Sequence, residues 1–345
     1  MKFKLWSMVR VSAAALSCVV FFQALAEADQ ESESVGVRQM LERFQRPDAI
    51  PFPADNRYSD AKAELGQRLF FDPRLSLSNS ISCASCHNPS FAWEDGQPLG
   101  SGHKMGKLGR HTPTILNLAW GELFFWDGRA ATLEQQALGP IQANAEMAQP
   151  LDDLIKELAQ FEGYRAAFAE AFPGEGISRE NIARAIATFE RTIVSNLAPF
   201  DRWVRGDENA VGASAKRGFI VFNTKGRCAN CHSGWNFTDD SFHDIGLKST
   251  DPGRATVVGS DVLRHAFKTP GLRNIAQRAP YMHDGSVPTL EAVIDHYVDG
   301  FIRRATLSDE IKPLALNDAE KSYLAAFLGT LTSKDDDMAL PTLPN

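Results

Sequence analysis

The chain has 345 residues, of which 43% are hydrophobic and 23% charged, and its formal net charge at pH 7 is −7. This length and composition allow two domains with ordinary apolar cores. The negative charge argues against nucleic acid as a partner but permits a basic partner protein.

The first 26 residues have the features of a signal peptide. A basic start precedes an apolar run over residues 11–22, and residues 24–26 form an A-x-A cleavage site. The apolar run is short for a membrane span, which disfavours the alternative of an uncleaved anchor. The sequence therefore predicts export to a bacterial periplasm, with no stable membrane span after cleavage.

The rest of the chain is predicted to be mainly α-helical, with long loops and few strands. Residues 91–110 are rich in glycine and predict a loop, and residues 199–207 predict a connection. Apolar residues recur at helical spacing in five stretches, namely 61–70, 151–172, 177–193, 213–222 and 318–331.

Two copies of a short motif dominate the sequence, CASCH at residues 83–87 and CANCH at residues 228–232. Two thiols two residues apart and followed by histidine are typical of c-type haem attachment. The thiols bond covalently to the porphyrin, and the histidine becomes the proximal iron ligand. The motifs therefore predict two covalently bound haem c groups, with attachment at Cys83, Cys86, Cys228 and Cys231 and iron ligation by His87 and His232.

Two other readings of the cysteine pairs are disfavoured. Zinc-ribbon knuckles are separated by roughly 15–20 residues, whereas Cys86 and Cys228 are much further apart. A thioredoxin-type redox pair requires neither the histidine nor a second copy. The fifth cysteine, Cys18, lies inside the predicted signal peptide, so no cysteine remains for a disulfide.

An internal repeat accompanies the two motifs. Three segments recur in the second half at equal spacing: TPTILN at 112–117 and TPGLRN at 269–274, WDG at 126–128 and HDG at 283–285, and TLE at 132–134 and 289–291. We therefore expect two cytochrome c-like haem domains related by internal duplication. The predicted division places an N-terminal haem domain at residues 27–197 and a C-terminal haem domain at residues 198–345.

Over about residues 61–331 the chain resembles the bacterial di-haem cytochrome c peroxidase family, including its MauG-like branch. The resemblance rests on both haem motifs and on FWDGR at 125–129, GPIQ at 139–142 with Glu146-Met147 after it, and APYMHDG at 279–285. It implies that hydrogen peroxide reacts at the first haem. Glu146 matches the distal acid–base residue, Gln136 and Pro140 match residues of the same pocket, and Trp126 matches a tryptophan between the haems.

The resemblance also implies candidates for further iron ligands. His103 matches a removable sixth ligand of the first iron. Tyr297 occupies a position where other peroxidases supply methionine and the MauG-like branch supplies tyrosine. A phenolate is a hard anionic donor that lowers the reduction potential of iron, so a second haem with this ligand could store an oxidising equivalent. Met282 is the alternative ligand of the second iron, and His296 is the next candidate after Met282.

Calcium is doubtful in this chain. The family holds calcium between its two domains with an asparagine and a threonine, and the matching positions here are His111 and Arg278, although Pro280 is retained. A cationic arginine opposes the binding of a second cation.

The sequence thus predicts a periplasmic di-haem peroxidase that receives electrons from a small cytochrome or cupredoxin. One alternative is MauG-like oxidation of tryptophan side chains in a partner protein, which Tyr297 favours. A second alternative is a non-catalytic electron-transfer cytochrome with both irons fully ligated. Glu146 in its motif disfavours the second alternative.

Overall fold

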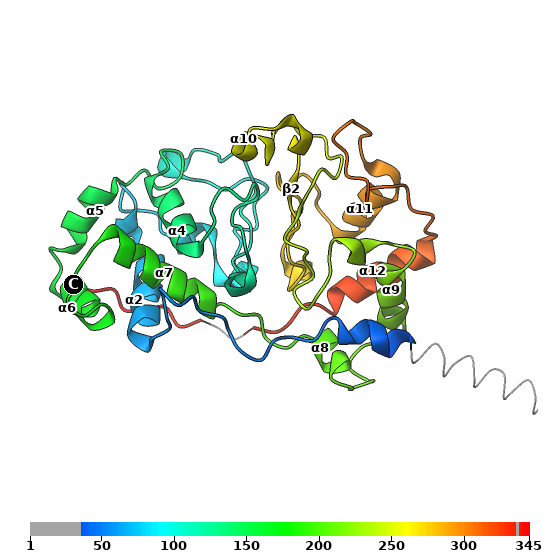
Figure 1. Ribbon diagram of the computed structural model, residues 1–345, viewed down its shortest axis with the longest axis horizontal. Helices are drawn as coiled ribbons and strands as arrows, with labels where there is room; N and C mark the ends of the chain where they lie inside the picture. The colour runs from blue at the N-terminus through cyan, green and yellow to red at the C-terminus, as the bar shows by residue number, and fades with distance from the viewer. Residues whose placement is uncertain (1–35, 336–337) are drawn as a thin grey trace, which may run out of the picture.

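A computed structural model describes residues 36–335 and 338–345, so the predicted signal peptide lies outside the described residues. Two lobes lie side by side in an elongated molecule (Figure 1). The described chain is mainly helical, as predicted, and its sheet consists of two short antiparallel strands, β1 (Phe242–His243) and β2 (Phe267–Lys268). Among these residues no helix combines the length and apolar character that crossing a bilayer requires.

The helices fall into two groups along the chain. Those of the first lobe are α2 (Asp60–Phe71), α3 (Cys83–Cys86), α4 (Leu133–Gln142), α5 (Leu151–Leu158), α6 (Glu162–Ala171) and α7 (Arg179–Thr192). Those of the second lobe are α8 (Pro199–Val204), α9 (Ala213–Asn223), α10 (Ala255–Val258), α11 (Leu290–Asp295), η8 (His296–Gly300) and α12 (Asp318–Gly329). Short 3-10 turns connect them: η1 (Pro73–Leu75), η2 (Pro89–Phe91), η3 (His103–Met105), η4 (Leu118–Trp120), η5 (Cys228–Asn230), η6 (Asp261–Leu263) and η7 (Ile275–Gln277).

Each lobe is built on a pair of closely packed helices, α2 with α7 and α9 with α12. A glycine makes the close approach possible in both pairs. A Cβ atom on Gly66 would lie 2.0 Å from the carbonyl oxygen of Ala185, and one on Gly218 would lie 1.9 Å from that of Tyr323. Because no side chain fits at such distances, glycine is required at both positions. The paired helices α2 and α9 are the ones that lead into the two haem motifs.

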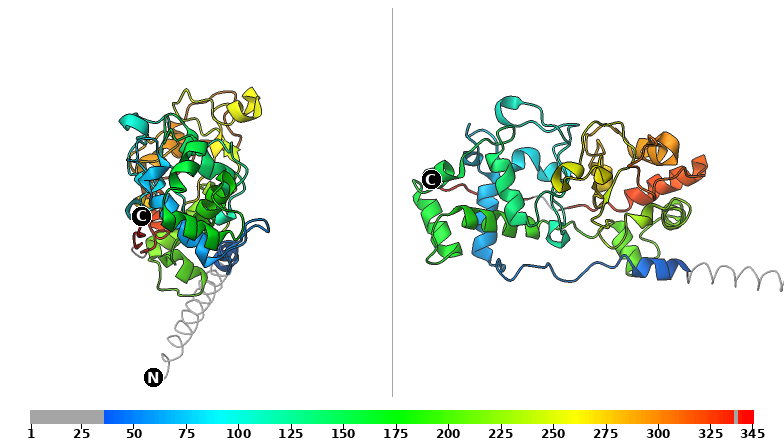
Figure 2. Two further views of the ribbon diagram at one scale, coloured as in Figure 1. Left: turned by 90° about the vertical axis from the view of Figure 1, so that its left-hand side faces the viewer. Right: turned by 45° about the horizontal axis from the view of Figure 1, so that its top comes forward.

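The two lobes have separate apolar cores, and the ends of the chain cross between them. Leu41 and Phe44 belong to the core of the second lobe, although they precede the first lobe in the chain. In the opposite direction, the C-terminal tail returns to the first lobe, where Arg74 donates a hydrogen bond to the carbonyl of Pro344 at 2.9 Å. The right-hand view of Figure 2 shows these crossing segments. The terminal segments therefore tie the lobes together.

Two local predictions differ from the structure. Residues 151–172 form two helices, because the chain turns at Phe161 and Tyr164 then points into the core. Residues 199–207 contain helix α8, whose first residue is a proline. Proline is favoured at this position because the first residue of a helix needs no backbone N–H. Helix α11 leads directly into the π-turn η8, which contains Tyr297; such turns are rare and are frequent at functional sites.

Candidate haem sites

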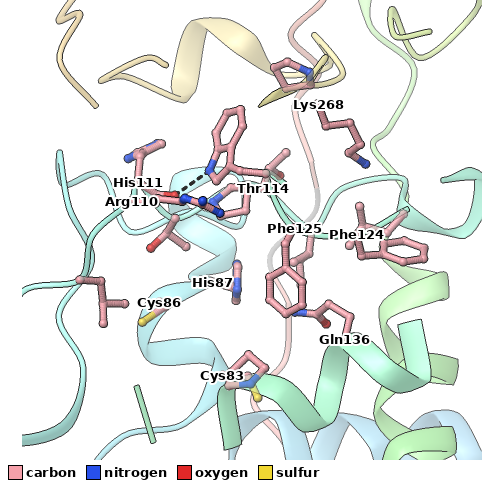
Figure 3. Close-up of a pocket in the computed structure, with 18 of the residues that line it drawn as sticks. Cys83, Cys86, His87, Arg110, His111, Thr114, Phe124, Phe125, Gln136 and Lys268 are labelled. Carbon is pink, nitrogen blue, oxygen red and sulfur yellow. Dashed lines mark hydrogen bonds between the residues drawn. The ribbon is translucent and has the colours of Figure 1, made fainter. Parts of the chain in front are cut away.

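The first haem motif faces a cavity of about 570 Å³. Helix α3 places Cys83, Cys86 and His87 on its wall (Figure 3). Helix α4 and the turn after it contribute Gln136 and Glu146 to the same cavity. The structure therefore brings together the first haem motif and the residues predicted to act on peroxide.

The histidines of both motifs are oriented in the same way. Nδ1 of His87 lies 3.2 Å from the carbonyl oxygen of Trp93, and Nδ1 of His232 lies 2.9 Å from that of Phe237. A carbonyl accepts only an N–H, so Nδ1 carries the proton and Nε2 remains available for a metal. Burial lowers the pKa of both rings, which keeps them in the neutral form that binds metals.

The residues around the first cavity fit a bound polar cofactor. Within the described part of the chain, four buried side-chain atoms lack a hydrogen-bond partner, namely His103 Nδ1, Gln136 Oε1, Glu190 Oε2 and Asp201 Oδ1. Gln136 and Glu190 both line this cavity. Buried polar atoms are costly without partners, so a group inside the cavity could satisfy them. The free thiols of both haem motifs also fit covalent attachment.

Glu190 is a site residue that the motif analysis missed. It lies on α7, is 4% exposed, and burial raises the pKa of its carboxyl group to about 8. The signal was present in the sequence: Ile182, Ile186 and Glu190 follow one another at helical spacing, so a carboxyl group stands on the apolar face of the helix.

Glu146 is a partly buried carboxyl group at the edge of the first cavity. Burial raises its pKa, and the charge of Arg129 opposes that rise. Arg129 lies over the ring of Phe125 at 3.5 Å and donates to Asp127 at 3.0 Å, so its position is fixed. A raised pKa makes a carboxyl group hold a proton more readily than an ordinary one, which suits a group that takes and returns protons.

His103 does not lie on the wall of this cavity, although its neighbours Ser101 and Gly102 do. Its backbone N–H donates to the carbonyl of Ala145 at 3.1 Å, which anchors the loop beside Glu146. Ligation of iron by His103 therefore stays a prediction.

The second haem motif faces a cavity of about 200 Å³, which Met282 and Tyr297 also line. Burial raises the pKa of the Tyr297 phenol. Met282 has a left-handed backbone with φ of 75°. His296 lies outside this cavity, and its Nε2 lies 2.9 Å from the carbonyl oxygen of Ile245. The geometry thus leaves Tyr297 and Met282 as candidate ligands and disfavours His296.

Trp126 lies between the two cavities and lines both of them. Its Nε1 donates a hydrogen bond to the carbonyl oxygen of His111 at 2.8 Å (dashed line in Figure 3). This contact fixes the indole ring at the junction of the lobes, which is the place expected for a tryptophan between two haems.

The family's calcium position holds an ion-pair network instead of an oxygen cage. Arg278 Nε lies 2.7 Å from one carboxylate oxygen of Glu94, and His111 Nε2 lies 3.1 Å from the other. Calcium takes six to eight oxygen ligands. The residues at this junction therefore do not fit calcium.

Comparisons with known proteins agree with a molecule built around two haem sites. A sequence profile described as di-haem cytochrome c peroxidase matches residues 60–209. The chain is 48% identical over 343 residues to methylamine utilization protein MauG of Methylorubrum extorquens, covering 98% of this chain and 97% of that protein. It is 39% identical over 288 residues to cytochrome c551 peroxidase of Nitrosomonas europaea, covering 82% of this chain and 83% of that one.

A solved structure of a MauG-like protein associated with microbial copper homeostasis has the same fold. The TM-score is 0.78 at 32% identity, covering 84% of this chain and 95% of that one. The chain belongs to the di-haem cytochrome c peroxidase family and to its MauG-like branch. The predictions of this family and of an oxidoreductase of the cytochrome c peroxidase type are thereby confirmed.

Proposed function

We propose that this protein is a periplasmic peroxidase that reduces hydrogen peroxide at the first haem site and passes or stores oxidising equivalents at the second. The observation that carries the proposal is the first cavity. It combines the attachment motif, an available His87 Nε2 and the partly buried carboxyl group of Glu146, and Trp126 links it to the second cavity. The signal-peptide features of residues 1–26 support the periplasm.

Haem held by the two motifs would supply the iron that binds peroxide and exchanges electrons. The side chains of the protein orient the iron ligands and move protons. The neutral rings of His87 and His232 offer Nε2, while the backbone carbonyls behind them fix the orientation of each ring. Glu146 would take a proton from one peroxide oxygen and deliver it to the other, a role that suits a partly buried carboxyl group with a raised pKa. Gln136 Oε1 can accept a hydrogen bond inside the cavity.

We also infer that the two haem domains arose by duplication, with the division at residues 197 and 198. Matched backbone geometry supports this inference. The isolated bridge between Phe124 and Ala130 corresponds to the bridge between Tyr281 and Val287. The preceding haem motifs each end in a histidine whose Nδ1 faces a carbonyl five or six residues on.

A second candidate function is the oxidation of tryptophan side chains in a partner protein. Tyr297 favours it, because a phenolate ligand would lower the potential of the second haem and make that haem a poor acceptor for routine cytochrome electrons. The identity of 48% with a MauG protein supports the same candidate. In the first function, the electrons come instead from a small cytochrome or cupredoxin.

Stopped-flow spectroscopy of the haem-loaded protein tests the proposal. One equivalent of hydrogen peroxide should change the haem spectrum rapidly, and a Glu146→Gln variant should lose that change. Glu122→Gln, which alters an exposed carboxyl group, is the matched control. Adding reduced cytochrome c then separates the two functions, since fast discharge supports the peroxidase and slow discharge supports oxidation of a partner protein. A wild-type protein that is inert to peroxide, with both irons fully ligated, would overturn both in favour of an electron-transfer cytochrome.

A further inference from the structure

Three buried charged side chains meet at the junction of the lobes, outside the groups that the proposed reaction uses. Glu94, His111 and Arg278 are 2%, 3% and 5% exposed. Nε of Arg278 lies 2.7 Å from Glu94 Oε1, and Nε2 of His111 lies 3.1 Å from Glu94 Oε2. Glu94 and Arg278 are 184 positions apart in the chain, so their ion pair joins the first lobe to the second.

Backbone carbonyls also accept hydrogen bonds from this network. Nη1 of Arg278 donates to the carbonyl of Gly271 at 2.7 Å, and Nδ1 of His111 lies 2.7 Å from the carbonyl of Gln97. Because one ring nitrogen of His111 faces a carbonyl and the other a carboxylate, both carry protons. The arginine and the imidazolium around one carboxylate leave one net positive charge within this group of three, which the nearby carboxylate of Asp95 partly offsets.

The network also holds the backbone that orients Trp126. The carbonyl of His111 accepts the indole N–H of Trp126 at 2.8 Å. The N–H of His111 donates to the carbonyl of His283 at 2.8 Å, and His283 is the residue that matches Trp126 in the sequence repeat. His111 is therefore bonded to the tryptophan between the cavities and to its counterpart in the second lobe.

A divalent cation could not share this position. Calcium requires six to eight oxygen ligands at 2.3–2.6 Å. Here N–H groups already engage both carboxylate oxygens of Glu94 and the carbonyl oxygen of Gly271. A divalent ion would also meet two positive charges in a buried site, where their repulsion is weakly screened.

We propose that Arg278 and His111, held by Glu94, form a built-in cationic centre that replaces a divalent ion at the junction and positions Trp126 between the two haem sites. Arg278 and Glu94 are thus positioning residues. Their effect on electron transfer between the haems rests on the proposed function, whereas the replacement of the ion does not.

The replacement of the ion is tested with calcium itself. We expect the haem-loaded wild-type protein to show no calcium binding by calorimetry and the same Tm with and without EGTA. A His111→Asn/Arg278→Thr double variant restores the calcium-type side chains beside Glu94, and we expect it to bind calcium and to lose Tm in EGTA. The proposal is overturned if the purified wild-type protein contains one calcium per chain or loses thermal stability in EGTA.

The positioning role is tested with Arg278→Met, with Arg278→Lys as the conservative variant. The matched control is Arg46→Met, because Arg46 also ties separate segments together through Ser195 but lines neither cavity. After peroxide is added, the spectral response of the second haem should be at least about tenfold slower in Arg278→Met, a change of ~1.4 kcal/mol in barrier. The first haem should still react at its usual rate, and lysine should restore most of the loss.

Equal rates in Arg278→Met and Arg46→Met would overturn the positioning role, because a purely structural residue would lower only the Tm. A wild-type protein that does not react with peroxide would instead overturn the proposed function. The calcium measurements would still decide the first part of the proposal.

Discussion

The two haem sites have matching backbone conformations but different side chains. Phe125 and Met282 occupy matching positions and have left-handed φ angles of 69° and 75°. Asn117 and Asn274 match in the same way, with φ angles of 63° and 57°. Left-handed conformations are uncommon outside glycine. Their recurrence at matching positions therefore indicates that the loops of the two sites share one backbone conformation. The different chemistry of the sites therefore comes from side chains.

At one matching position a carboxyl group of the first cavity stands where the second cavity has an apolar side chain. Gly66 packs against Ala185 and Phe189, as Gly218 packs against Tyr323 and Phe327. By this correspondence Glu190 of the first cavity matches Leu328 of the second. The first site thus gains acid–base groups and a larger cavity, while the second has Met282 and Tyr297 on the wall of a smaller one.

The largest expected effect is the loss of acid–base chemistry at the first site. Glu146→Gln keeps the shape of the side chain but cannot take up a proton. We expect the rate of the reaction with peroxide to fall by about 10²–10⁴, the usual contribution of a positioned acid–base group. Stopped-flow spectroscopy measures the rate, and the spectrum of the second haem should stay as in the wild type. A rate equal to that of Glu122→Gln would exclude Glu146 from the reaction.

The next largest effect concerns the second site. Replacing the phenol with a thioether in Tyr297→Met should raise the reduction potential of the second haem by a substantial part of the ~0.8 V range that axial ligands cover. Met282→Leu is the matched variant on the same cavity wall, and it should leave the potential nearly unchanged. Potentiometric titration measures both. The opposite pattern would make Met282 the ligand and would remove Tyr297 from the site.

A third comparison tests whether the two helix pairs are equivalent. Gly66→Ala and Gly218→Ala each push a methyl group against a backbone carbonyl of the partner helix. Overpacking of this kind costs about 1–3 kcal/mol, and we expect similar losses from both variants. Thermal unfolding followed through each haem spectrum measures the effect. A loss confined to one variant would show that only that helix pair depends on close contact.

Sequence reasoning was most successful where the signal is local. The helical spacing of residues 61–70, 213–222 and 318–331 predicted α2, α9 and α12 to within a few residues at each end, because an apolar face on a long helix needs no information from the rest of the chain. The two cysteine motifs located both cavities because each motif is a run of five consecutive residues and can be recognised without knowledge of the fold.

The contacts between distant segments could not be predicted. Sequence alone named His111 and Arg278 as departures from the family pattern, but it gave no indication that Glu94, 184 positions from Arg278, lies between them. Helix α11 leads into the π-turn at Tyr297, and no residue pattern in the sequence predicts that turn. Whether the His103 side chain reaches the first iron stays a prediction, because loop geometry is set by packing.

The smallest expected effect comes from Glu190, the carboxyl group that the second site lacks. Burial raises its pKa to about 8, so between the ordinary carboxyl pKa and pH 8 the folded protein keeps a proton that the unfolded chain has lost. Stability should therefore decline as pH rises through this window. Glu190→Gln, which cannot ionise, should flatten the decline and raise the Tm above pH 8 by about 2–4 °C, or ~1 kcal/mol. Glu170→Gln on the exposed face of α6 is the control, and thermal scans from pH 5 to 9 measure both. An unchanged pH profile would mean that a partner inside the haem-loaded cavity already satisfies the Glu190 carboxylate.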